Sequence, residues 1–185
     1  NPTGAVYSRE ELEALAEACQ KHDLLIISDE IYEKLIYTSE PHISIASLNE
    51  DAYTRSLVVN GMSKPYAMTG WRIGYAAGNA ELIKSMSDIS SHSPSNPVTF
   101  AQYGAIEAIK GPQDDLLRMK AEFAARRDYV LERLANVPYV KPIEPAGAFY
   151  VFFDLTDVIE GRFKDADEFS ELLLEEELVA LVPGC

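Results

Sequence analysis

The sequence of 185 residues contains few of the residues that would identify a class of protein at once. Its 2 cysteines, Cys19 and Cys185, offer neither a disulfide framework nor a metal-ligand spacing, so both are predicted to be free thiols. Its 3 histidines, His22, His42 and His92, lie in unrelated contexts and are predicted to be surface or loop residues. The chain is therefore expected neither to be a disulfide-stapled domain nor to bind a metal.

Long apolar runs and positive charge are also scarce. No run is long enough to span a bilayer and no basic-then-apolar leader is present, so a cytoplasmic location is expected. Lys and Arg number 16 against 30 Asp and Glu, which gives a net charge of −14. This balance argues against nucleic acid and against an anionic membrane as partners, because both associations depend on clustered Lys and Arg.

The hydrophobic pattern of the first half alternates between helical and strand periodicity, which predicts an α/β fold. Ser8 and Glu11 form a capping box ahead of an amphipathic helix. The apolar run from Leu24 to Ser28 follows that helix, as is typical of a buried parallel strand. Residues 33–55 are expected to be irregular. The further elements are predicted as strands over 57–60 and 71–77 and helices over 80–91 and 98–110.

The second half begins with a long helix and continues with short elements. Apolar residues keep a helical period from Gln113 to about Asn136, and a helix of this length usually connects two bodies of structure. The elements after Pro138 are predicted as strands over 139–141, 148–153 and 178–182 and a helix over 166–177. A domain boundary is therefore expected near residue 113, dividing residues 1–112 from residues 113–185.

The stretch from Val58 to Tyr75 contains the residues that best indicate a chemistry. It places Lys64 on a loop between two strand-like segments, with Arg72 eight residues further on. An amine that can form a Schiff base, next to a guanidinium that binds anions in a bidentate way, indicates a carbonyl cofactor that carries a phosphate. Pyridoxal 5'-phosphate (PLP) is the obvious candidate. Taken singly, Lys64 also reads as a solvated surface lysine and Arg72 as a structural ion-pair partner.

Small residues around Lys64 and Arg72 suit the same ligand. Gly70 and Gly74 flank Arg72 and would let the backbone approach a phosphate closely. Ser63 would either donate a hydrogen bond to the phosphate or serve only as a turn residue.

Asp29 is predicted to lie at the carboxyl end of the first buried strand, where ligands bind in open α/β sheets. A pyridine ring needs an anion at its nitrogen to stay protonated, and Asp29 is of the type that supplies one. Tyr32 and the amide of Asn1 could donate hydrogen bonds to the phenolate oxygen of the cofactor. Read alone, Asp29 could be a helix N-cap, Tyr32 a core aromatic residue and Asn1 a turn residue.

These residues together resemble a known family, the class I aminotransferases of PLP fold type I, and within it the bacterial aspartate aminotransferase branch. The resemblance lies in four motifs that follow one another in the family order over nearly the whole chain. The motifs are Asn1-Pro2-Thr3-Gly4, Ser28-Asp29-Glu30-Ile31-Tyr32, Ser63-Lys64 with Gly70-Trp71-Arg72-Ile73-Gly74-Tyr75, and Gly147-Ala148-Phe149-Tyr150. The fold implied is part of the three-layer α/β large domain followed by part of the α+β small domain.

The resemblance implies a role for each candidate residue. Lys64 would hold PLP as a Schiff base and act in catalysis, and Asp29 would pair with the pyridinium nitrogen. Asn1 and Tyr32 would bind the phenolate oxygen, and Arg72 would bind the phosphate. Some members carry a phosphate-binding serine three residues before the lysine, where this chain has glycine, so part of the phosphate site must come from elsewhere.

The resemblance also implies that the chain is a fragment. In the family the glycine-rich phosphate turn and the aromatic residue stacked on the ring precede the position of Asn1, and the arginine that binds the substrate carboxylate follows that of Cys185. The 185 residues alone are therefore expected to be inactive. The full-length protein is expected to be a cytoplasmic homodimer of amino acid metabolism that uses an amino acid, aspartate-like by preference, and a 2-oxo acid.

Two other functions share these residues. A carbon-sulfur β-lyase uses the same lysine and aspartate, but releases pyruvate and ammonia without consuming a 2-oxo acid. Some transcription regulators carry an aminotransferase-like domain that senses PLP without turnover. The forms Asp29-Glu30-Ile31-Tyr32 and Gly70-Trp71-Arg72 favour an enzyme over such a regulator.

Overall fold

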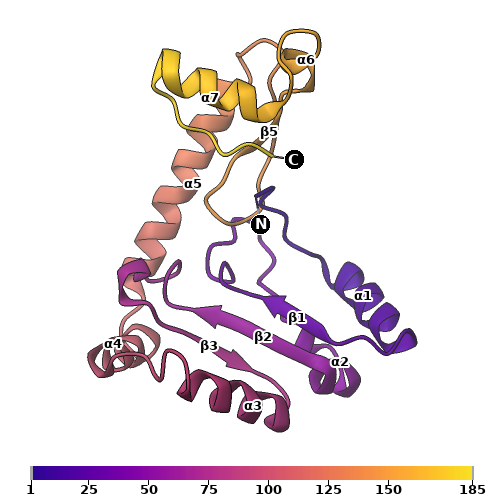
Figure 1. Ribbon diagram of the computed structural model, residues 1–185, viewed down its shortest axis with the longest axis vertical. Helices are drawn as coiled ribbons and strands as arrows, with labels where there is room; N and C mark the ends of the chain where they lie inside the picture. The colour runs from indigo at the N-terminus through magenta and orange to yellow at the C-terminus, as the bar shows by residue number, and fades with distance from the viewer. Residues whose placement is uncertain (1, 185) are drawn as a thin grey trace. The chain divides into compact units, whose positions relative to one another are not determined.

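The computed structural model describes residues 2–184, which form two compact units (Figure 1). The larger unit contains residues 5–123 and 146–148, and the smaller unit contains residues 124–145 and 149–184 with residues 2–4. The division between them falls inside helix α5 (Asp114–Leu134). This helix confirms the long helix predicted from the apolar period. Among these described residues, no helix has the length and hydrophobicity needed to cross a membrane.

A sheet of mixed direction forms the centre of the larger unit. Its strands are β1 (Ile26–Asp29), β2 (Ser56–Gly61) and β3 (Gly74–Ala77), in the order β1-β2-β3. β1 and β2 are parallel, with Ile26 opposite Ser56, whereas β3 is antiparallel to β2, with Gly74 opposite Gly61. The carboxyl ends of β1 and β2 and the amino end of β3 therefore meet at one edge of the sheet.

Helix α1 (Arg9–Lys21) begins with the predicted capping box. The Ser8 hydroxyl accepts the N–H of Glu11, and the Glu11 carboxylate accepts the N–H of Ser8 at 2.7 Å. The helix buries Leu12 and Ala16 in one core cluster with Ile45 and Ala52. Cys19, on this helix, is a free thiol, as predicted. Cys185 and Asn1 lie outside the described residues.

The segment predicted to be irregular contains two short helices. These are the 3-10 helix η1 (Ile45–Ser47) and the α-helix α2 (Glu50–Arg55). The prediction of an irregular segment is therefore wrong for α2, which is capped by the Asn49 side chain through the N–H of Ala52 at 2.8 Å. A capping asparagine followed by acidic residues was a local signal for this helix, but its six residues are too few to show a hydrophobic period.

Helices α3 (Ala80–Ser91) and α4 (Thr99–Lys110) follow the sheet and agree with the predicted ranges. The strand predicted over 71–77 is shorter, because the backbone of Arg72 is left-handed with φ 51° and cannot continue a strand. Residues 146–148 return to the larger unit, where Gly147 bridges Ile36.

The smaller unit contains a two-stranded antiparallel sheet of β4 (Lys141–Ile143) and β5 (Phe152–Asp154), with helices α6 (Thr156–Ile159) and α7 (Ala166–Glu177). Both strands start later than predicted, because Tyr139 and Ala148 have left-handed backbones with φ 67° and 61°. The final strand predicted over 178–182 is wrong, since these residues form no strand in the described chain. Leu178, at φ 59°, ends α7 instead.

Candidate functional site

Three of the predicted site residues come to the same edge of the larger unit's sheet. Asp29 is the last residue of β1, Lys64 lies three residues after the end of β2, and Arg72 lies two residues before β3. Because β1 is parallel to β2 and β3 is antiparallel to it, all three positions lie at the edge formed by the carboxyl ends of β1 and β2. A carboxylate at the end of β1, and an amine and a guanidinium in the connection between β2 and β3, thus lie at this edge.

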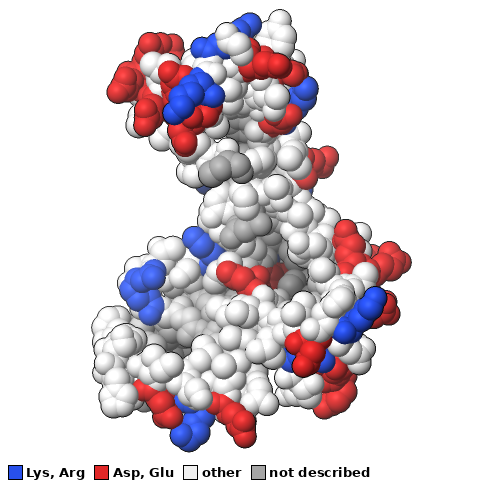
Figure 2. Space-filling model, turned by 45° about the vertical axis from the view of Figure 1, so that its right-hand side comes forward, with Lys and Arg blue, Asp and Glu red and all other residues white. Residues whose placement is uncertain are grey.

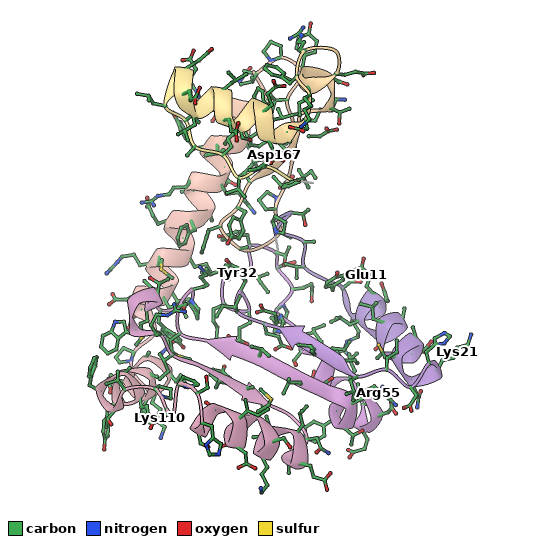
Figure 3. All side chains as sticks on the ribbon, viewed as in Figure 1. Glu11, Lys21, Tyr32, Arg55, Lys110 and Asp167 are labelled. Atoms are coloured by element: carbon green, nitrogen blue, oxygen red, sulfur yellow. The ribbon has the colours of Figure 1, made fainter. Side chains whose placement is uncertain are left out.

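The turn after β1 carries Asp29 and Tyr32. The Asp29 side chain is exposed, and its Oδ1 accepts the N–H of Ile31 at 3.1 Å, which fixes the carboxylate locally. The N–H of Glu33 donates to the carbonyl of Glu30, and the N–H of Leu35 donates to that of Tyr32, both at 2.9 Å. Tyr32 is half-buried and lies beyond the end of β1 (Figure 3). Asp29 is thus a strand-end residue and does not cap a helix.

The Lys64 loop, residues 62–68, is a compact turn held at both ends. The N–H groups of Tyr66 and Met68 both donate to the Met62 carbonyl, at 3.2 and 3.4 Å. Met62 and Met68 are buried against Ala105 of α4, so the loop is attached to the helix on either side of Lys64. Lys64 itself is half-buried. A packed loop of this kind restricts where the amine can reach, which is what a reactive lysine requires.

Ser63 also lies in the Lys64 loop, and its side chain is half-buried. Its position beside Lys64 is consistent with either of the roles predicted for it, a phosphate donor or a turn residue.

Arg72 follows the 3-10 helix η2 (Thr69–Trp71) and has an exposed side chain. Its left-handed backbone, φ 51° and ψ 52°, reverses the chain before β3. Its Nη1 donates to the Thr69 carbonyl at 3.0 Å, and the guanidinium carries further N–H donors. Arg72 therefore has the reach and the donor pattern that suit a phosphate.

A cavity of about 680 Å³ lies next to Arg72. It is lined by Gly70, Trp71, Arg72, Ser90, Phe100 and residues 94–98. Of the predicted site residues that the structure describes, Arg72 alone lines this cavity, so the cavity does not mark the position of Lys64 or Asp29. Trp71 meets Phe100 edge to face in its wall, with ring centroids 5.8 Å apart.

Glu30 is a buried charged residue that the sequence patterns did not single out. Its side chain is 6% exposed. Its Oε1 accepts the hydroxyls of Ser28 at 3.1 Å and Ser44 at 2.7 Å, and its Oε2 lies 3.0 Å from His42 Nε2. Burial raises the pKa of Glu30, but hydrogen bonds from His42, Ser44 and Ser28 outweigh it and hold the pKa below its ordinary value. We call these four residues the Glu30 cluster.

His42 lies in a loop, as predicted. Its side chain is 26% exposed and pairs with Glu30, a contact that the prediction did not include. No local pattern indicates this contact, because twelve residues separate the two side chains. A weak signal was available at Glu30, since a residue that follows an exposed strand-end aspartate is expected on the opposite, buried face.

Tyr75 is a second residue near the site that the patterns missed. It lies opposite Asn60 at the start of β3. Partial burial, together with the nearby negative charge of Glu33, raises the pKa of the Tyr75 phenol, and its hydroxyl can donate a hydrogen bond.

The charged side chains are distributed in small groups on the face drawn in Figure 2. Lys and Arg lie there among neutral and acidic residues and do not form a continuous basic surface on that face. A phosphate site must therefore depend on a local guanidinium such as Arg72, because the net charge of −14 repels anions.

Comparison with known proteins gives consistent matches over the whole chain. The family model described as aminotransferase class I and II matches residues 1–185. The aspartate aminotransferase of Bacillus subtilis (strain 168) is 49% identical over 185 residues, which are 100% of this chain and 47% of that protein. The chain thus spans about half the length of the curated relatives it matches.

Solved structures of similar sequence have the same fold. The aromatic aminotransferase from Pyrococcus horikoshii OT3 matches with a TM-score of 0.92 and 40% identity, covering 99% of this chain and 48% of that one. The aspartate aminotransferase from Rhizobium meliloti matches with a TM-score of 0.93 and 38% identity, again covering 99% of this chain and 48% of the other.

Proposed function

The chain belongs to the family of class I and II aminotransferases, and from this membership we propose that the full-length protein is a PLP-dependent aminotransferase. It would transfer an amino group between an amino acid and a 2-oxo acid. The chain has the fold of the fold type I PLP-dependent enzymes, of which it covers about half. Residues 1–112 would belong to the PLP-binding large domain, and residues 113–185 would form the connecting helix and part of the small domain.

One observation carries the proposal. Parallel pairing of β1 with β2 and antiparallel pairing of β2 with β3 bring Asp29, Lys64 and Arg72 to one edge of the sheet. These groups fit PLP by their chemistry: a carboxylate for the pyridinium nitrogen, an amine for the aldehyde and a guanidinium for the phosphate. When bound, PLP supplies an electron-withdrawing ring that stabilises negative charge at the substrate Cα.

Each of these residues would have a separate role. The Lys64 amine would hold the cofactor and, once released by the substrate, move a proton between the substrate Cα and the cofactor C4′. The Asp29 carboxylate would keep the ring nitrogen protonated. Asn1 and Tyr32 would donate to the phenolate oxygen, while Arg72, with Ser63 as a second donor, would bind the phosphate.

An acidic amino acid with 2-oxoglutarate is the proposed substrate pair. The support is the 49% identity to an aspartate aminotransferase. The similar structure of an aromatic aminotransferase, at 40% identity, makes an aromatic amino acid the alternative. The full-length protein is further proposed to be a homodimer in the cytoplasm.

The test is covalent trapping in the full-length protein. PLP is added, the complex is reduced with borohydride, and peptide mapping is expected to find the label on Lys64. A Lys64→Ala variant should lose the label, whereas Lys34→Ala, which removes an exposed lysine that pairs with Glu33, should keep it. A label on another lysine would overturn the proposed role of Lys64.

Product analysis separates the reaction types. Aspartate with 2-oxoglutarate is expected to yield glutamate and the 2-oxo acid of aspartate in equal amounts. Release of pyruvate and ammonia from a sulfur amino acid, without consumption of a 2-oxo acid, would show a β-lyase instead. Binding of PLP without turnover of any amino acid would show a sensor.

A further inference from the structure

The carboxylate of Glu30 is buried where an apolar side chain would be the ordinary choice. Its residue is 6% exposed, next to Asp29, whose side chain is exposed. Taking a charge out of water is costly, and replacing buried ionic groups with apolar ones is often neutral or even stabilising. A buried charge is therefore weak evidence for stability, and its best-attested use is to specify one local arrangement.

The Glu30 cluster connects the end of β1 to a distant part of the chain. His42 and Ser44 both contact the Glu30 carboxylate, at 3.0 and 2.7 Å. Ser44 directly precedes η1, whose Ile45 is buried in the core cluster with Leu12 of α1. The carboxylate is thus attached to a segment that is itself fixed in the hydrophobic core.

The backbone of Glu30 also continues the sheet beyond β1. Its N–H donates to the Val59 carbonyl at 2.9 Å, and its own carbonyl accepts the N–H of Glu33 at 2.9 Å. Glu30 therefore fixes the turn that carries Asp29 and Tyr32 by its side chain and by both of its backbone groups. By contrast, the Asp29 carboxylate accepts the N–H of Ile31, which lies within the same turn.

We infer that Glu30 is a positioning residue, which through His42 and Ser44 holds the turn of residues 29–32 so that the Asp29 carboxylate is presented to the ring nitrogen of the cofactor. Glu30 acts through Asp29 and does not touch the cofactor. The inference rests on the proposed function, because it takes the cofactor role of Asp29 as given.

A double-mutant cycle in the full-length protein tests the inference. The dissociation constant for PLP is measured by absorbance titration of the apoprotein for the wild type, Glu30→Gln, Asp29→Asn and the double variant. Glu30→Gln is expected to weaken PLP binding about tenfold, the loss of about one charge-assisted hydrogen bond. In the Asp29→Asn background, the same substitution is expected to change binding less than about twofold, because coupled residues are not additive.

The visible spectrum of bound PLP separates positioning from simple stability. At temperatures well below the melting temperature of each variant, Glu30→Gln is expected to shift the absorbance of the bound cofactor in the same direction as Asp29→Asn. Ser44→Ala, which removes one hydroxyl and keeps the charge, is expected to give a smaller shift and about threefold weaker binding. His42→Gln, which keeps an N–H donor, should be milder than His42→Ala.

The matched control is Glu40→Gln, the same substitution at an exposed residue of the loop that follows. It should leave both the dissociation constant and the spectrum unchanged. Fully additive effects in the cycle, or a lower melting temperature for Glu30→Gln with unchanged affinity and spectrum, would overturn the inference. If Asp29→Asn itself changed neither quantity, the proposed role of Asp29 would fail, and this inference with it.

Discussion

At the scale of single residues, Arg72 shows how a backbone conformation positions a functional group. Arg72 lies between the 3-10 helix η2 and β3, and its left-handed backbone, with φ 51°, reverses the chain there. Its guanidinium donates one hydrogen bond to the Thr69 carbonyl. A guanidinium presents its donors as a planar fork that matches two phosphate oxygens, whereas an ammonium is a point charge. The identity of this side chain should therefore matter beyond its charge.

Arg72→Lys in the full-length protein is accordingly expected to weaken PLP binding by about tenfold or more, because the bidentate geometry is lost. Pyridoxal, which lacks the phosphate, should bind the variant as well as it binds the wild type. Both affinities can be measured by absorbance titration. An equal loss for pyridoxal and PLP would show that Arg72 does not act on the phosphate.

Glu30 should make the stability of the protein depend on pH. Its pKa is held below the ordinary value of 4.5, because hydrogen bonds to the charged form outweigh the effect of burial. A carboxyl with a lowered folded-state pKa stabilises the protein fully above its unfolded pKa, and this contribution is lost as the pH falls through the folded pKa.

Glu30→Gln is therefore expected to lower the free energy of unfolding by about 1–3 kcal/mol relative to the wild type near neutral pH. The difference should shrink as the pH falls below the ordinary value of 4.5. Urea unfolding of the full-length proteins at a series of pH values measures it. A difference that stayed constant from neutral to strongly acidic pH would show that the ionised carboxylate is not its source.

At the scale of elements, the pairing of β2 with β3 depends on two facing glycines. Gly74 lies opposite Gly61 at the edge of the sheet where the Lys64 loop begins. A Cβ on Gly74 would lie 2.9 Å from the backbone oxygen of Asn60, closer than real Cβ contacts allow. The backbone cannot move aside as a flexible side chain would, so the strands would have to separate.

Gly74→Ala is expected to lower the free energy of unfolding by about 1–3 kcal/mol, as overpacking does. It should also slow the covalent trapping of PLP on Lys64, because the Lys64 loop begins at the facing pair of Gly61 and Gly74. Gly70→Ala is the matched control, since a Cβ there would meet nothing within 4 Å. Its expected effect is within about 0.5 kcal/mol. Equal effects of the two substitutions on urea unfolding would contradict this account of the strand pair.

At the scale of the whole molecule, the larger unit exposes apolar surface at β1. Leu25, which directly precedes β1, is 77% exposed, and Ile27, within β1, is 74% exposed. Within the described residues, β1 pairs only with β2, so one edge of this strand is open. Exposed apolar faces and open strand edges favour association with other chains.

The isolated chain of 185 residues is therefore expected to self-associate and to show no transamination, whereas the full-length protein should form a discrete dimer with activity. Light scattering coupled to size exclusion, together with a coupled assay for aspartate and 2-oxoglutarate, measures both properties. A monodisperse and active isolated chain would show that the described residues suffice for the site, against this expectation.

Local signals in the sequence were enough to predict most helices and the type of the main strands. The Ser8–Glu11 capping box and the apolar periods of α3, α4 and α5 act over a few residues, and the structure confirms them. Where predicted strands were wrong or too long, as at Arg72 and Leu178, a left-handed residue ended or interrupted the extended backbone. Single left-handed residues other than glycine leave little trace in a sequence pattern.

The sequence by itself thus determined the family, the order of the motifs and the residue types that suit PLP. Only the tertiary structure decided that Asp29, Lys64 and Arg72 share one edge, because that follows from strand pairing across long separations. The contact between Glu30 and His42 likewise depends on how the chain returns after β1. Local interactions are encoded in neighbouring residues, whereas such contacts exist only once the whole unit has folded and brought distant residues together.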